Sequence, residues 1–145
     1  MKRLIGLTIA GLAVAAIAAW GIPARTEVLS YKAELKGNSE VPPNASKGTG
    51  SVTLSYDPAE KKLSWTGSYS GLSGPVSVAH FHGPAAAGKN AGIAVGVASG
   101  NLPVSFEGSA TLTDAQAADL AAGRWYLNLH TAAYPAGEIR GQVVK

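Results

Sequence analysis

The sequence predicts an all-β domain, an antiparallel Greek-key β-sandwich or barrel with one short helix. Three observations predict it. Short runs of residues alternate between apolar and polar side chains, which is typical of antiparallel strands with one face in water. The 18 glycines and 8 prolines among 145 residues supply frequent turns between these runs. After residue 27, only one segment carries the signals of a helix.

The strands are expected one after another from residue 29 to near the C-terminus. The first three, at residues 29–36, 51–56 and 63–69, show the alternation most clearly, and a turn at residues 57–60 joins the second to the third. Five more strands are expected, at residues 76–82, 93–98, 104–112, 125–131 and 137–144. The predicted core contains Trp65, Phe81, Phe106, Trp125 and Leu127.

The single helix is predicted at residues 114–122. Thr113 is a favourable N-cap, and Gln116, three residues later, completes a capping box. Gly123 is the residue type expected just past the C-terminal end. The segment is short and rich in alanine, so packing by Leu120 must decide whether it is stable.

The N-terminus reads as an export signal at residues 1–24. Lys2 and Arg3 form a positive start, and residues 4–20 are almost wholly apolar. An uncleaved anchor remains the alternative, because residues 4–22 could just span a bilayer. In both cases the domain at residues 28–145 is expected outside the cytoplasm, either periplasmic or secreted, and it contacts a membrane only if the segment is uncleaved.

Composition excludes several classes of function. Without Lys2 and Arg3, 10 basic residues face 9 acidic ones, and no basic run is interleaved with aromatic residues, so no nucleic-acid partner is expected. The absence of cysteine excludes disulfides and thiolate ligands. No Ser-His-Asp set, phosphate-binding loop or pair of catalytic carboxylates is evident, so a binding protein is expected rather than an enzyme.

All three histidines of the chain lie in two predicted strands. His80 and His82 flank Phe81, and alternation along a strand places both imidazoles on one face. His130 lies on another strand and could complete a set of three nitrogen ligands for copper or zinc. The alternative is that these histidines only hydrogen-bond loops at strand ends.

Strand parity extends this site. If Leu127 and Leu129 face the core, the side chains on the opposite, exposed face include those of three residues that could support the ligands, namely Asn128, Glu138 and Arg140. Val76 and Val78 argue against this choice, because they share the parity of His80 and His82 unless a bulge intervenes. The small-residue loop at residues 84–92 is either a lid over the site or a connector.

Several motifs together resemble a known family. Residues 40–43 (Glu-Val-Pro-Pro), 79–84 (Ala-His-Phe-His-Gly-Pro), 120–123, 126–131 (Tyr-Leu-Asn-Leu-His-Thr) and 135–142 occur in the order seen in CHRD domains, which are chordin-type modules also found in exported bacterial proteins. The resemblance covers about residues 30–144. It implies an extracytoplasmic β-sandwich module and leaves the biochemistry open.

A weaker resemblance concerns the metal. The His-x-His strand, the glycine-rich loop, a later histidine and Arg140 are similar to copper/zinc superoxide dismutase, in which the His-x-His pair binds copper on a Greek-key barrel. The fold is thus expected to be immunoglobulin-like or superoxide-dismutase-like. The bridging histidine, the other zinc ligands and the cysteines of that family are absent here, so dismutase activity is not expected.

Two functions follow as expectations. One is an exported protein that binds copper, in preference to zinc, through His80, His82 and His130, and that sequesters or delivers the ion. The other is a metal-independent interaction or adhesion module with an extracytoplasmic protein partner.

Overall fold

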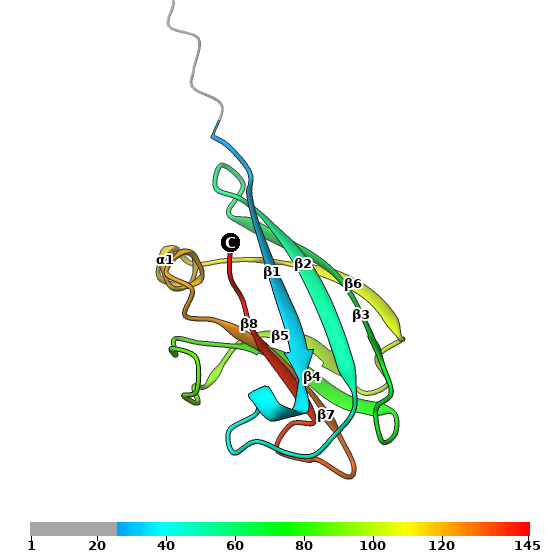
Figure 1. The fold of residues 1–145 in the computed structure, drawn as a ribbon. Coiled ribbons are helices and arrows are strands. Elements are labelled where there is room, and N and C mark those ends of the chain that lie inside the picture. The colour runs from blue at the N-terminus through cyan, green and yellow to red at the C-terminus, as the bar shows by residue number, and fades with distance from the viewer. Residues whose placement is uncertain (1–25) are drawn as a thin grey trace, which may run out of the picture.

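The structure is a computed structural model, and it describes residues 26–145 (Figure 1). The expected signal peptide at residues 1–24 and the alternative anchor lie outside the described residues. Within residues 26–145, no helix has the length and apolar character needed to cross a membrane. The elements are β1 (Leu29–Lys36), a 3-10 turn η1 (Gly37–Ser39), β2 (Thr49–Asp57), β3 (Lys62–Ser70), β4 (Val76–His82), β5 (Ile93–Ser99), β6 (Ser105–Thr111), α1 (Asp114–Ala121), β7 (Tyr126–Thr131) and β8 (Ile139–Gln142).

The eight strands form one antiparallel sheet with the order β5-β4-β7-β8-β1-β2-β3-β6. β1, β2 and β3 are successive neighbours, as are β4 with β5 and β7 with β8, whereas the chain crosses the sheet between β3 and β4, between β5 and β6, and between β6 and β7. The sheet curls so that its two halves face each other across a shared core, as a nearly closed barrel or sandwich (Figure 1). The predicted all-β fold class is confirmed.

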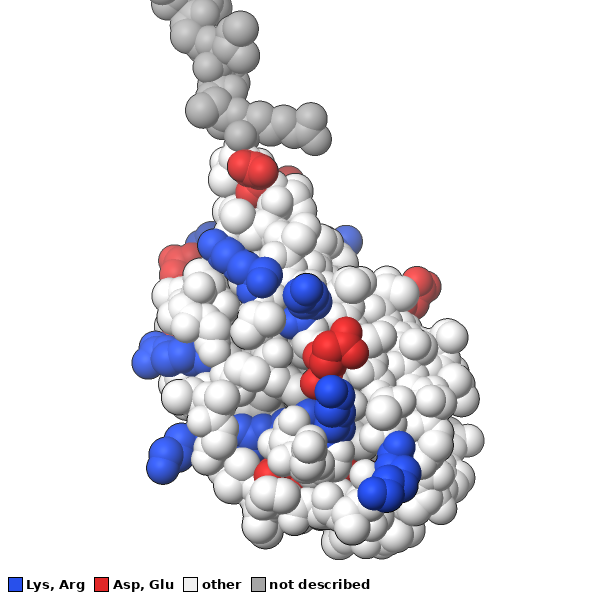
Figure 2. Space-filling model, viewed as in Figure 1, with Lys and Arg blue, Asp and Glu red and all other residues white. Residues whose placement is uncertain are grey.

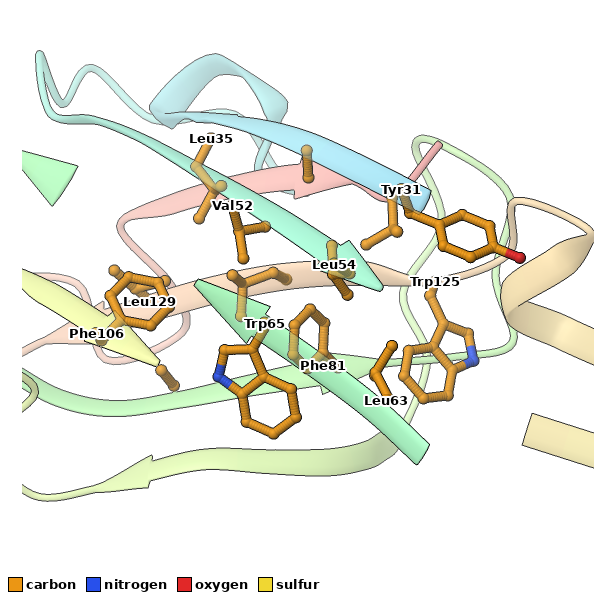
Figure 3. Packing of buried hydrophobic residues seen from close by; sticks show 14 of the residues in the cluster. Tyr31, Leu35, Val52, Leu54, Leu63, Trp65, Phe81, Phe106, Trp125 and Leu129 are labelled. Atoms are coloured by element: carbon orange, nitrogen blue, oxygen red, sulfur yellow. The ribbon is translucent and has the colours of Figure 1, made fainter. Parts of the chain in front are cut away.

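The predicted core residues all lie inside this barrel. Trp65, Phe81, Phe106, Trp125 and Leu127 are buried. The rings of Trp65 and Phe81 meet edge to face with centroids 5.3 Å apart, and Trp125 lies on the other side of Phe81 at 5.9 Å (Figure 3). Leucine and valine side chains from β1, β2, β3 and β7 fill the space around the rings (Figure 3).

Two strand glycines make room for these rings. A Cβ on Gly67 would lie 2.4 Å from Cζ of Phe106, and a Cβ on Gly108 would lie 2.5 Å from Cζ2 of Trp65. Real contacts of this kind are never so short, so the neighbouring ring would have to move. Glycine within these strands therefore reflects close approach of an aromatic ring.

The helix forms as its capping residues predict. The Thr113 side chain accepts a hydrogen bond from the Gln116 backbone N–H, and the Gln116 side chain accepts one from the Thr113 N–H. The helix ends at Ala121, one residue earlier than expected, and Gly123 follows with φ of +69°. Leu120 is fully buried, and the Gln116 amide also donates to the Ala94 carbonyl, which ties the helix to β5.

The last strand is shorter than predicted. Pairing between β7 and β8 begins at Ile139, because Gly137 has φ of +129° and Glu138 lies in a bend. Beyond β8, the Val143 N–H donates to the Trp125 carbonyl, and Val144 forms a bridge with Lys32. The residues that the sequence assigned to one strand of 137–144 therefore divide into a bend, a short strand and a bridge.

Charge is thinly spread over the surface. On the face shown in Figure 2, basic and acidic side chains are interspersed among uncharged residues. The two ion pairs in the described part of the chain, Lys61 with Asp114 and Arg124 with Asp119, both involve the helix. Such pairs at the surface contribute little to stability.

Candidate metal site

The three histidines come together on the outer face of β4 and β7. One ring nitrogen from each of His80, His82 and His130 lies within 4.8 Å of those of the other two. The ring of His80 is central, with its centroid 5.5 Å from that of His82 and 5.6 Å from that of His130. Ligand nitrogens about 2.1 Å from one ion lie at most about 4.2 Å apart, so a pair of nitrogens at the 4.8 Å limit would have to close by about 0.6 Å to share a metal.

The register of β4 and β7 explains this meeting. His80 is opposite Asn128, and His82 is opposite Tyr126. His130 is two residues beyond Asn128 on β7 and thus on the same face, diagonal to His80.

A β-bulge resolves the conflict over parity in β4. Val76 pairs with Thr131 and Val78 pairs with His130, so the register shifts by one residue between the two valines. Val76 can therefore be buried in the core while His80 and His82 point to the outer face. The sequence pattern allowed the histidines to face outward only if a bulge interrupted β4, and the structure contains that bulge.

The face that carries the histidines is covered, which corrects the expectation that it is exposed. Asn128 and Arg140 retain only 4% and 2% of their exposure. The cover is the loop at residues 83–92, named the strap from here on, which contacts the face through hydrogen bonds. Two of these hydrogen bonds join Ala91 of the strap to His82 and to Tyr126. Two more join Arg140 to Asn90 and Gln142 to Ala85. The loop is more than a connector.

Glu138 does not belong to this cluster, although the sequence placed it there. Its carboxylate accepts hydrogen bonds from Ser46 Oγ (2.7 Å), from Ser73 N and Oγ (2.9 and 2.6 Å) and from Thr131 Oγ1 (2.5 Å). The bend at Glu138 breaks the alternation with Arg140 and turns this carboxylate toward the side of β7 that carries Thr131. Hydrogen bonding to these donors lowers the pKa of Glu138, against the opposing effect of burial.

A backbone carbonyl lies beside Nδ1 of two imidazoles. His82 Nδ1 lies 3.0 Å from the Ala91 carbonyl oxygen, and His130 Nδ1 lies 2.9 Å from that of Pro135. Because a carbonyl oxygen can only accept, Nδ1 of His82 carries the proton, and its Nε2 keeps a lone pair when the ring is neutral. In His130 both ring nitrogens lie beside oxygen acceptors, since Asn128 Oδ1 is near Nε2, so these contacts do not select one neutral tautomer. Metal-binding histidines are usually oriented by a partner of this kind.

Two nitrogens of the cluster have no hydrogen-bond partner in the described part of the chain. They are His80 Nδ1 and His82 Nε2, and both are buried. A buried polar atom without a partner costs free energy, so these atoms call for a partner. Asn128 Oδ1 lies 3.0 Å from His130 Nε2, and this amide would have to release His130 before the ring could bind a metal there.

The environment favours neutral imidazoles. Burial, together with the neighbouring His82 and His130, lowers the pKa of His80 below its ordinary value. Burial also lowers the pKa of His82, although its hydrogen bond with Ala91 acts in the opposite direction. Neutral imidazole is the form that binds metal ions, so the lowered pKa of His80 and of His82 favours that form in these two residues.

A second layer of side chains supports His82. The Tyr126 ring is stacked on the imidazole, with centroids 4.9 Å apart and planes 5° from parallel. The guanidinium carbon of Arg140 lies 3.4 Å from the Tyr126 ring centroid. Of the three predicted supporting residues, the structure thus places Asn128 and Arg140 beside the histidines.

Strand parity places Tyr126 on this face but gave it no role in the layer, and sequence reasoning missed Glu40 altogether. Glu40 is buried, and its Oε1 has no hydrogen-bond partner among the described residues. Burial raises the pKa of Glu40 to about 7, although the charge of Arg140 and the amide of Asn128 lower it. The Glu-Val-Pro-Pro motif at residues 40–43 was the available signal, but it was used only for the resemblance to CHRD domains.

The fold and the cluster define the class of protein as a small all-β domain that collects three imidazoles on one face of a nearly closed barrel. A model of the CHRD domain matches residues 31–143. The chain therefore belongs to the CHRD domain family, as its motifs predict. Neither the curated proteins nor the solved structures contain a significant match to the chain, and the weaker similarity to copper/zinc superoxide dismutase is not shown.

Proposed function

We propose that this CHRD domain acts outside the cytoplasm and binds copper(II) through His80, His82 and His130. The observation that carries the proposal is the pair of buried, unpartnered nitrogens, His80 Nδ1 and His82 Nε2, in a cluster whose ligand atoms lie within 4.8 Å of one another. A metal ion would give both nitrogens the partner that they lack.

The donor set favours copper over zinc. The cluster offers only imidazole nitrogens, and at one nitrogen site copper(II) binds more tightly than zinc, following the Irving–Williams order. Three protein ligands leave a coordination position open to water or to a ligand from another molecule. Such a site suits sequestration or delivery of an ion, and the proposal is a copper-binding protein without an enzymatic step of its own.

Calorimetric titration tests the proposal directly. The untagged protein, purified from the extracytoplasmic fraction of expressing cells, is titrated with copper(II) and with zinc(II). We expect one copper per chain, tighter than zinc, and loss of most of the affinity in His82→Ala. Binding should weaken as the pH falls below about 6.5, because a protonated imidazole cannot bind the ion.

A matched control removes surface adsorption as an explanation. Ser55 is an exposed residue of β2 on the other half of the sheet, and Ser55→Ala should bind copper as the wild type does. His82→Ala should remain folded, as judged by its circular dichroism spectrum. Equal, weak uptake by the wild type and by His82→Ala would mean that the histidines are structural.

One observation favours the second candidate, a metal-independent interaction module. β5 is an edge strand without a charged side chain, and Ile93 at its start is 60% exposed. An uncharged edge of this kind can accept a strand from a protein partner. This function takes the place of copper binding if the titration fails.

A further inference from the structure

We infer that Arg140 is a positioning residue for the proposed copper site: it fastens the strap over the histidines and thereby slows the release of the ion. The inference rests on the proposed function, and it concerns a residue that does not itself touch the metal. Arg140 is 2% exposed and lies at the centre of the contacts between β8 and the strap.

The base of the strap is held by the backbone. Gly83 N donates to the Gly92 carbonyl at 3.1 Å, which closes the loop. Ala85 N donates to the Arg124 carbonyl at 2.8 Å, and the Gln142 amide donates to the Ala85 carbonyl at 2.9 Å. These contacts fix the two ends of the strap but leave its middle part without backbone bonds to the sheet.

Arg140 holds the middle of the strap. Its Nη1 donates to Asn90 Oδ1 at 2.8 Å, and its Nη2 donates to the Lys89 carbonyl. Residues 86–90 are all exposed, so apolar packing does not hold them down. The other anchor in this part is the Asn90 amide, which donates to the Val41 carbonyl at 3.2 Å. The fork of the guanidinium is well suited to holding two acceptors at once.

Two routes lead from Arg140 to His82. Along the chain, Asn90 precedes Ala91, whose carbonyl fixes the Nδ1 proton of His82 and so leaves Nε2 for the metal. Through space, Arg140 lies on the Tyr126 ring, and that ring is stacked on His82. The two routes are also connected to each other, because the Tyr126 hydroxyl accepts a hydrogen bond from the Ala91 N–H at 3.2 Å.

The charge of Arg140 and its hydrogen bonds to the strap have opposite expected effects on how tightly copper is held. A buried positive charge near a copper(II) ion repels it, so loss of that charge alone would make copper bind more tightly. Loss of the fastening would instead free the strap and speed release. Arg140→Lys keeps the charge but loses the fork, whereas Arg140→Gln loses both.

The experiment measures the rate at which copper leaves the loaded protein for an excess of chelator, by stopped flow. We expect Arg140→Lys and Arg140→Gln each to release copper at least about tenfold faster than the wild type, as loss of a hydrogen bond to a charged group implies. The nitrogen hyperfine pattern in the electron paramagnetic resonance spectrum should also change, because the Ala91 carbonyl no longer orients the His82 ring so that Nε2 faces the ion.

Two further variants serve as control and substitute. Lys89→Gln removes a positive charge from the exposed strap but keeps the carbonyl that Arg140 uses, so it should release copper at the wild-type rate. If the Arg140 variants fail to fold, Asn90→Ala removes the fastening from its exposed end and should give the same faster release.

Hydrogen exchange in the metal-free protein separates the two ways of failing. We expect amides of the strap to exchange faster in Arg140→Lys than in the wild type, with or without copper. A wild type that takes up no copper overturns the proposed function, and the positioning role with it. A wild type that binds copper while the Arg140 variants release it at the same rate, or bind it more tightly, overturns the positioning role alone.

Discussion

Replacement of Glu138 separates the stability of the domain from the proposed copper site. The carboxylate is 1% exposed and accepts four hydrogen bonds, from Ser46, Ser73 and Thr131. It ties the segment before β2 and the segment before β4 to the junction of β7 and β8. We therefore expect Glu138→Gln and Glu138→Ala to destabilise the fold and to leave copper affinity unchanged.

The contacts set the magnitude of the loss. Glutamine keeps the shape, and the three hydroxyl groups can rotate to meet its amide, so Glu138→Gln should cost about 1–2 kcal/mol through loss of the charged acceptor. Alanine removes every acceptor, and the Ser73 backbone N–H cannot turn to another partner. Unsatisfied buried donors cost about 1–3 kcal/mol each, so Glu138→Ala should cost about 3–5 kcal/mol.

The pH dependence provides a sharper test. The pKa of Glu138 is lowered in the folded protein, so its contribution to stability is present above about pH 4.5 and is lost as the pH falls through the folded value. In urea unfolding, the stability difference between the wild type and Glu138→Gln should therefore shrink below pH 4.5.

Glu107, exposed on β6, provides the control, and Glu107→Gln should show neither the loss of stability nor this pH dependence. A difference between the wild type and Glu138→Gln that stays constant from pH 7 to pH 3 would refute the reasoning. So would a loss of copper affinity in Glu138→Gln as large as that in His82→Ala.

Two further predictions concern the core and the second layer. Phe81→Ala should destabilise the domain by about 3–5 kcal/mol in denaturant unfolding, because the ring is fully buried between Trp65 and Trp125; a loss below about 1 kcal/mol would contradict this packing. Glu40 has a folded pKa raised to about 7, so it favours folding below about pH 4.5 and loses that contribution as the pH rises through 7. Glu40→Gln should thus be less sensitive than the wild type to a rise from pH 5 to pH 8, by about 3 kcal/mol, and an unchanged pH profile would count against the raised pKa.

The strands and the core were predictable because their signals are local. Alternation with a period of two marks a half-buried strand in the residues themselves, and it marked β1, β2 and β3. The capping box of α1 spans only Thr113 to Gln116. The meeting of His80, His82 and His130 also followed from parity, once the leucines of β7 were assigned to the core.

The supporting residues were harder to predict because they depend on single irregular positions. Because of the bend at Glu138, the side chains of Glu138 and Arg140 do not lie on the same face. The alternation of apolar and polar residues at 137–144 contains no signal for this bend. The bulge between Val76 and Val78 was required by the pattern, but its position depends on pairing with β7.

Contacts between segments that are distant in the sequence could not be predicted either. The strap lies over the histidines because Arg140 and Gln142, about 50 residues later in the chain, supply its hydrogen bonds. Glu40 joins the same layer from the turn after β1, close to Asn128. Small residues in a loop carry no signal of the face that they cover, so the sequence left open whether this loop was a lid or a connector.

The unpartnered buried polar atoms of the described residues cluster at the face that carries the proposed site. Glu138 is a buried carboxylate with every hydrogen bond that it needs, and its pKa is lowered, whereas Glu40 is a buried carboxylate with a bare oxygen and a raised pKa. The sequence alone treats the two as equivalent.

Five buried side-chain polar atoms lack a partner in the described residues, and three of them lie around Asn128: Glu40 Oε1, His80 Nδ1 and His82 Nε2. The other two belong to core aromatic rings, Tyr31 and Trp65. Unpaired buried groups are costly, and a bound ion or a functional role is one of the reasons for which folded proteins retain them. The two imidazole nitrogens are the atoms on which the proposed copper site already rests, and Glu40 Oε1 adds to them an unpaired buried atom that does not belong to a histidine.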